Sequence, residues 1–240
     1  MNLLRTTLLA LALAAASLSH AAEPAAGPDP APVATPATEA APTPPADPVQ
    51  SGLAAIQRRW AEIQYQTPAD QRADAFEALA AEAERFKQAH PDRAEPLIWE
   101  GIVLSTWAGA KGGLSALGLC KDARADFEAA LKLDPQALQG SAYTSLGSLY
   151  YQVPGWPIGF GDDERAEELL KQALSIAPDS IDANYFYGDY LIDQGRYAEA
   201  VDVLTHAQAA PPRPGRELAD SGRQQEIAGK LALARGKVRS

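Results

Sequence analysis

The stretch Ile181–Pro214, with the sequence IDANYFYGDYLIDQGRYAEAVDVLTHAQAAPPRP, decides the fold of this chain. Two amphipathic segments flank a turn at Gly195, and small residues stand where two helices would cross. Gly188 and Ala200 allow two backbones to approach closely, where larger side chains would hold them apart. The spacing therefore predicts a pair of antiparallel helices. The pattern is carried by Tyr187, Gly188, Leu191, Gly195, Tyr197, Ala200, Leu204, Ala207 and Pro212.

This spacing resembles the tetratricopeptide repeat, a pair of helices spanning about 34 residues. Two earlier copies, at about 94–135 and 140–178, match in both halves but carry insertions between their helices, at 111–118 and 152–162. Both insertions are therefore expected at one edge of the array. Insertions of this kind often lie on the binding face of a repeat protein.

The insertion at 152–162 is the most unusual segment of the sequence. Its glycines permit backbone angles barred to other residues, and its prolines fix φ. Trp156 and Phe160 bring more apolar area than an exposed loop needs, so we expect the loop to fold back as a packed wedge on the helices. The candidate contact residues are Pro154, Gly155, Trp156, Pro157, Phe160 and Asp162.

Three arginines after the last repeat, Arg213, Arg216 and Arg223, have two interpretations. They form either a solvated, partly ion-paired start to the last helix, or a clasp for the insertion loop. In the second case one arginine packs on Trp156 or pairs with Asp162.

The segments on either side of the repeats are also expected to be helical. Apolar stripes predict a helical hairpin at 49–90, broken at Thr67-Pro68, although its spacing leaves open whether it is a true repeat. A polar amphipathic segment at 216–235 is typical of a capping helix. The chain is thus predicted to be all-α, a tetratricopeptide-like α-solenoid of antiparallel helix pairs over 49–240 with a C-terminal capping helix.

The amino end has the pattern of an exported protein. Residues 1–21 contain a single charge and a short apolar run, which predicts a signal peptide cleaved after Ala21 or Ala22 rather than a membrane anchor. Residues 22–48 are rich in Pro and Ala, hold nine of the 19 prolines and predict a disordered linker. The alternative for this linker is a proline-rich docking ligand. We expect a periplasmic protein that does not span the membrane.

Composition and motifs argue against several classes of function. A formal charge of −10 argues against a nucleic-acid partner, because phosphate backbones need clustered Lys and Arg. His90 and His206 have no second ligand at metal spacing, and Cys120 fits a small buried hydrophobe. The acidic residues after Asp162 suit a helix amino end better than a cation site. We therefore predict no enzyme activity, no cofactor and no metal site.

The repeat register places a mixed apolar, hydroxylic and acidic groove on the concave face of the array. First-helix residues line this face, and aromatic members fit either a groove or packing between helices. The predicted groove residues are Ile98, Ile102, Thr106, Thr144, Ser148, Tyr151, Asp182, Tyr185 and Asp189.

The repeats and the Pro-Gly-Trp-Pro-Ile-Gly-Phe-Gly-Asp insertion together resemble the T-component-like proteins of tripartite ATP-independent periplasmic (TRAP) transporters. They are also similar to the helical-repeat domain of eukaryotic microtubule-dynamics regulators, which share a Pro-Gly-Trp turn. The resemblance covers about 97–235 and implies a non-catalytic exported protein. We expect a scaffold that binds a protein or peptide through the groove and the 152–162 loop. The alternative is a TRAP accessory protein that binds a solute-binding protein or a small apolar ligand.

Overall fold

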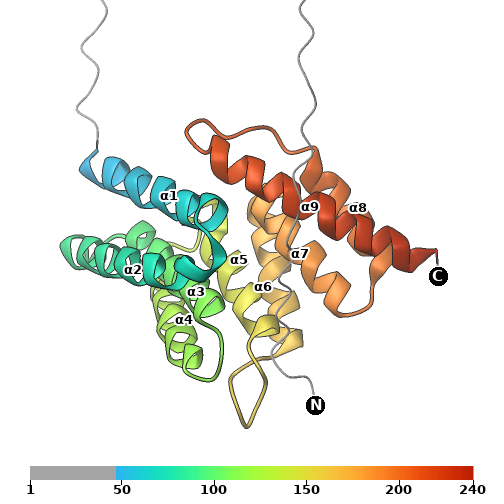
Figure 1. Cartoon of the computed structure of the whole chain (residues 1–240), viewed down its shortest axis with the longest axis horizontal. Helices are drawn as coiled ribbons and strands as arrows, with labels where there is room; N and C mark the ends of the chain where they lie inside the picture. Colours follow the sequence, from blue (N-terminus) through green and yellow to red (C-terminus); the bar gives the residue numbers. More distant parts are fainter. Residues whose placement is uncertain (1–46, 240) are drawn as a thin grey trace, which may run out of the picture. The chain divides into compact units, whose positions relative to one another are not determined.

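Apolar residues at helical spacing give nine α-helices and a short 3-10 helix within residues 47–239, the part that the computed structural model describes (Figure 1). The all-α prediction is confirmed for these residues. The expected signal peptide and nearly all of the expected linker lie outside them. The elements are α1 (Pro48–Gln66), η1 (Ala69–Gln71), α2 (Arg72–Ala89), α3 (Ala94–Lys111), α4 (Ala116–Leu133), α5 (Ala137–Gln152), α6 (Asp163–Ile176), α7 (Ile181–Asp193), α8 (Tyr197–Gln208) and α9 (Glu217–Val238).

Successive helices pack as pairs, α3 with α4, α5 with α6 and α7 with α8. A glycine of each first helix receives a large side chain of its second helix. A Cβ atom on Gly101 would lie 2.5 Å from the Phe127 ring, and one on Gly188 would lie 2.5 Å from Leu204. These contacts confirm the close crossing that the small residues predict.

The hairpin α1–α2 is built in the same way. A Cβ atom on Gly52 would lie 2.5 Å from the Phe86 ring, so a glycine again faces a large side chain across the pair. Phe76 and Leu79 of α2 are fully buried and join the same apolar cluster as Phe127. The hairpin therefore shares one core with the repeat at α3–α4.

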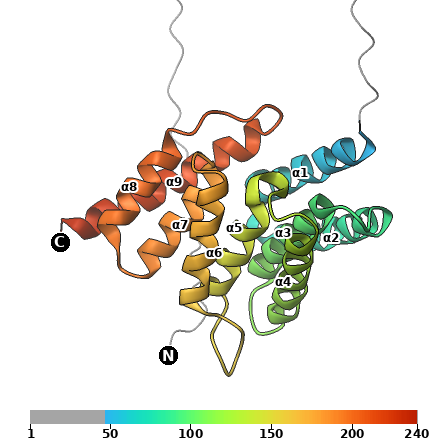
Figure 2. The same cartoon turned by 180° about the vertical axis from the view of Figure 1, so that it is seen from behind.

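The first helices of the pairs, α1, α3, α5 and α7, contact one another in succession. The last helix, α9, packs on α7 and α8 as a cap would, and it also contacts α1 (Figures 1 and 2). The two ends of the helical array therefore meet across the face that the first helices form.

Candidate functional site

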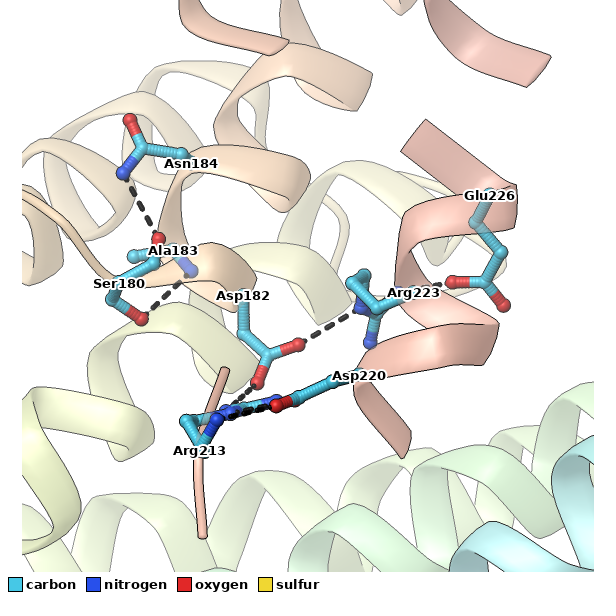
Figure 3. Close-up of polar contacts among 8 residues, drawn as sticks. All are labelled: Ser180, Asp182, Ala183, Asn184, Arg213, Asp220, Arg223 and Glu226. Carbon is cyan, nitrogen blue, oxygen red and sulfur yellow. Dashed lines mark hydrogen bonds and ion pairs between the residues drawn. The ribbon is translucent and has the colours of Figure 1, made fainter. Parts of the chain in front are cut away.

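The face formed by the first helices is occupied by the chain's own C-terminal segment. Arg213, which precedes α9, donates from Nη1 to Asp182 Oδ2 at 2.7 Å, and from Nε and Nη2 to Asp220 Oδ1 at 2.8 and 2.6 Å (Figure 3). Arg223 of α9 donates from Nε to Asp182 Oδ1 at 2.8 Å. Asp182 therefore accepts from two arginines at once. We call Asp182, Arg213, Asp220 and Arg223 the arginine cluster.

The start of α7 positions Asp182 for this role. Ser180 caps the helix, because its Oγ accepts a hydrogen bond from the backbone N–H of Ala183 at 3.3 Å (Figure 3). Asn184 donates to the carbonyl oxygen of Ser180 at 2.9 Å and fixes the same turn. The side chains of Ser180 and Asn184 thus fix the backbone on either side of Asp182.

The charges in the cluster stabilise one another. Burial alone would raise the pKa of Asp182, but the guanidinium groups of Arg223 and Arg213 outweigh it and lower that pKa to about 2. Arg223 also lies over the rings of Tyr185 and Phe186, 4.1 and 4.9 Å from their centroids. Its side chain therefore makes charge-assisted hydrogen bonds and cation–π contacts together.

The same C-terminal segment reaches α3 and α1. Arg216 lies over the Trp99 ring of α3, 5.2 Å from its centroid. On α9, a Cβ atom on Gly222 would lie 2.3 Å from the Tyr65 ring of α1, so only glycine lets the two helices approach this closely. These contacts extend the closure from α7 to α3 and α1.

The predicted groove residues are accordingly not an open surface. Ile98, Thr144, Ser148 and Tyr185 are buried, and the other five members are only partly exposed. Asp189 accepts a hydrogen bond from Tyr151 at 2.9 Å and pairs with Lys230 of α9. Thr106 of α3 accepts a hydrogen bond at its Oγ1 from Nε1 of Trp60 on α1 at 3.0 Å, while Ile102 packs at the edge of the core. The register predicts a groove along these residues, but in the structure they are packed between helices or paired with other residues of the chain.

The expected clasp for the insertion loop is also wrong. Arg213, Arg216 and Arg223 find their partners on α3, α7 and α9, and none of these partners is a residue of the loop. Arg124 of α4 takes the place expected for them. Its guanidinium lies 5.0 Å from the Phe160 ring centroid and 5.4 Å from that of Tyr150.

The insertion loop between α5 and α6 is closed at its base by backbone hydrogen bonds. The N–H of Asp162 donates to the carbonyl of Tyr150 at 2.9 Å, and the N–H of Gly161 donates to that of Pro154 at 3.0 Å. A Cβ atom on Gly161 would lie 1.9 Å from the carbonyl oxygen of Val153, which no other residue could accommodate. The loop is therefore a tight turn with a fixed base.

The two ends of the loop are anchored differently from its tip. Asp162 caps α6, because its Oδ1 accepts a hydrogen bond from the backbone N–H of Arg165 at 3.0 Å. Pro154 is partly buried, whereas Gly155 and Pro157 are exposed, and the peptide bond before Pro157 is cis. The tip thus stands out from anchored ends.

The prediction that the loop packs on the helices as a wedge holds for Phe160 but not for Trp156. Phe160 is partly buried and meets the Tyr150 ring edge-to-face, with 5.6 Å between centroids. Trp156, in contrast, is 89% exposed, and Ile158 is 57% exposed. The closed base directs the tip away from the helices, so Trp156 finds no surface to pack on.

A third exposed apolar residue lies on the neighbouring turn. Leu114, between α3 and α4, is 69% exposed, and both turns lie at the same end of the helices in Figures 1 and 2. The predicted alignment of the two insertions agrees with this arrangement. We call Leu114, Trp156 and Ile158 the apolar edge.

Cys120, His206 and His90, the residues considered as catalytic or metal-binding candidates, lie in surroundings that fit structural roles. Cys120 is buried, and burial raises the pKa of its thiol, which makes it a poor nucleophile. His206 lies at the surface, 2.9 Å from Asp179, and His90 ends α2. Within residues 47–239, no group of three or more His, Cys, Asp or Glu is arranged to hold a metal ion. No helix in this same range is long and apolar enough to cross a membrane.

Comparison with known proteins supports the repeat assignment. The family model "Tetratricopeptide repeat" matches residues 158–219. The crystal structure of TTC0263, a thermophilic TPR protein of Thermus thermophilus, is similar with a TM-score of 0.52 and 22% identity, covering 80% of this chain and 92% of that one. The fold is that of a tetratricopeptide-repeat (TPR) protein.

Two further comparisons add no functional detail. The crystal structure of MamA is similar with a TM-score of 0.40 and 18% identity, over 70% of this chain and 92% of that chain. A search of curated proteins finds no match.

The two loop aromatics should differ in their effect on stability. Trp156→Ala should leave the free energy of unfolding within about 0.5 kcal/mol of wild type, because an exposed side chain loses little on truncation. Phe160→Ala should lower it by roughly 1–3 kcal/mol, less than the loss of a fully buried ring. Urea unfolding followed by circular dichroism measures both. A loss at Trp156 as large as at Phe160 would contradict the exposed tip.

Proposed function

We propose that this TPR protein is a non-catalytic scaffold that binds a protein partner through the apolar edge. The observation that carries the proposal is the exposure of Trp156 on a loop whose base is fixed. Tryptophan is among the residues that contribute most to protein interfaces. A loop that is already rigid loses little conformational entropy on binding. Most of the free energy gained from its contacts therefore contributes to the affinity.

The apolar edge is favoured over the concave groove as the binding surface. The groove face already holds the arginine cluster and α9, so a partner there would first have to displace charged hydrogen bonds. The partner that fits the edge offers an apolar pocket for the indole of Trp156, flanked by apolar surface for Ile158 and Leu114. Leu114 lies on one turn and Trp156 and Ile158 lie on the other. The apolar surfaces of the partner must therefore match the spacing between the two turns.

A second candidate function is an accessory role in a TRAP-type transport system. It is favoured by the exposure of Gly155 and Trp156 in the Pro154-Gly155-Trp156 turn, a segment on which the resemblance to T-component-like proteins rests. In this alternative the partner is a periplasmic solute-binding protein, or the scaffold carries a small apolar ligand. The identity of the captured partner separates this role from a general scaffold.

Affinity capture tests the binding role of the apolar edge. The tagged full chain, Trp156→Ala and Leu233→Ala are expressed in the native cells, and bound proteins are identified by mass spectrometry. Leu233 is a matched control, because it is 47% exposed but lies on α9. Wild type and Leu233→Ala should retain a common partner that Trp156→Ala loses by at least about tenfold, or about 1.4 kcal/mol.

The outcomes of this capture separate the candidates. A solute-binding protein as the lost partner supports the TRAP-type role, and any other protein supports the general scaffold. Equal capture by wild type and Trp156→Ala would exclude the apolar edge as the binding surface. A small apolar molecule that copurifies with wild type, without a protein partner, would favour the ligand-carrying role.

We also propose that the protein acts in the periplasm. Support comes from the signal-peptide pattern of residues 1–21. Osmotic-shock fractionation should release the protein with the periplasmic contents, and mass spectrometry should find a mature chain that begins at Ala22 or Glu23. A full-length chain recovered with the cytoplasm would contradict the proposal.

A further inference from the structure

A groove lies between α2 and α4, with α3 as its floor. Its volume is about 620 Å³. The groove is distinct from the apolar edge, and none of Leu114, Trp156 and Ile158 lines it. Its charged lining consists of Glu77, Glu84, Lys87, Glu100, Asp122 and Asp126.

Lys87 holds the floor of this groove together. Its Nζ lies 2.9 Å from Asp126 Oδ1 of α4 and 2.9 Å from Glu100 Oε2 of α3. The two carboxylate side chains are 10% and 7% exposed, so two buried anions share one partly buried cation. A buried charge is costly unless it is fully paired, and this trio carries one negative charge in excess.

Glu100 is the carboxylate of this trio that is least well compensated. Its Oε2 is buried and accepts no hydrogen bond of good geometry, although the Lys87 ammonium is near enough to compensate its charge. Burial raises the pKa of Glu100 despite the opposing influence of Lys87. A carboxylate oxygen in this position is short of donors, and most buried polar atoms in proteins have one.

The rim of the groove is also negatively charged. Glu77, Glu84 and Asp122 are exposed around it, so five carboxylates surround the single ammonium of Lys87. Leu104 and the partly buried Trp107 give the groove an apolar wall. The groove therefore combines an excess of carboxylates with an apolar wall that suits an aliphatic chain, and the Lys111 ammonium lies over the Trp107 ring, 5.2 Å from its centroid.

We propose that this groove binds a basic segment of a partner protein, with an arginine side chain entering between α2 and α4. The guanidinium offers five donors in a planar fork that matches carboxylates, more than the three of an ammonium. Its aliphatic stem packs along Leu104 and Trp107, and the Lys87 side chain shifts to share Glu100 and Asp126. The groove is a surface additional to the apolar edge.

A matched pair of peptides tests this proposal on the full chain. The probe is a short acetylated and amidated peptide with two arginines and two leucines on one helical face. Its twin carries neutral citrulline in place of each arginine. Fluorescence anisotropy with a labelled peptide should show at least about tenfold tighter binding of the arginine form, or about 1.4 kcal/mol. Its affinity should also fall as the salt concentration rises.

Variants of the rim connect the binding to this groove. The double variant Glu84→Gln/Asp122→Asn removes two exposed charges, so it should fold normally and weaken arginine-peptide binding by roughly threefold to tenfold. Glu164→Gln, an exposed change on α6, is the control and should bind as wild type does.

Three results would overturn the proposal. These are equal binding of the arginine and citrulline peptides, unchanged binding in the double variant, and no binding of the arginine peptide up to about 1 mM. In the last case the Lys87 trio serves as an ion pair between helices and nothing more.

Discussion

The pairing of Asp182 with Arg213 and Arg223 is the interaction on which the arrangement of the described helices depends. It links the third repeat to the connection before α9 and to α9 itself. Breaking such a partly buried network by removing one partner costs several kcal/mol, because the remaining charges lose their compensation. The network holds α9 across the face of the first helices, and α9 in turn contacts α1. A repeat array that would otherwise have a free end is closed on itself.

This closure bears on where a partner could bind. In an open solenoid the concave face is available to a partner. Here the face is filled by charged and aromatic contacts within the chain, and the exposed apolar residues lie on the turns between helices, at Leu114, Trp156 and Ile158. The turns therefore have the composition of an interface, while the former groove has that of an interior. The acidic groove between α2 and α4 adds a surface of opposite character.

The sequence predicted what repeats and local spacing determine, and it failed where contacts are distant in the chain. Gly188 and Leu204 stand at repeat positions, so their packing could be foreseen. The pairing of Arg213 with Asp182 spans 31 residues and joins the connection before α9 to α7, and no local pattern indicates it. Trp156 was misplaced because composition cannot tell whether a rigid loop folds onto its helices or away from them. The Lys87 groove joins three helices, and its carboxylates resemble ordinary surface charges in the sequence.

Hydrogen–deuterium exchange of α9 tests the closed face most directly. Amides in the middle of a docked helix exchange only through large-scale opening, whereas those of an undocked helix exchange rapidly. The amides of 219–231 should be protected in wild type nearly as strongly as those of α3. In Asp182→Asn their protection should fall while that of α3 stays high. Rapid exchange throughout α9 in the wild-type protein, with α3 protected, would contradict the closure.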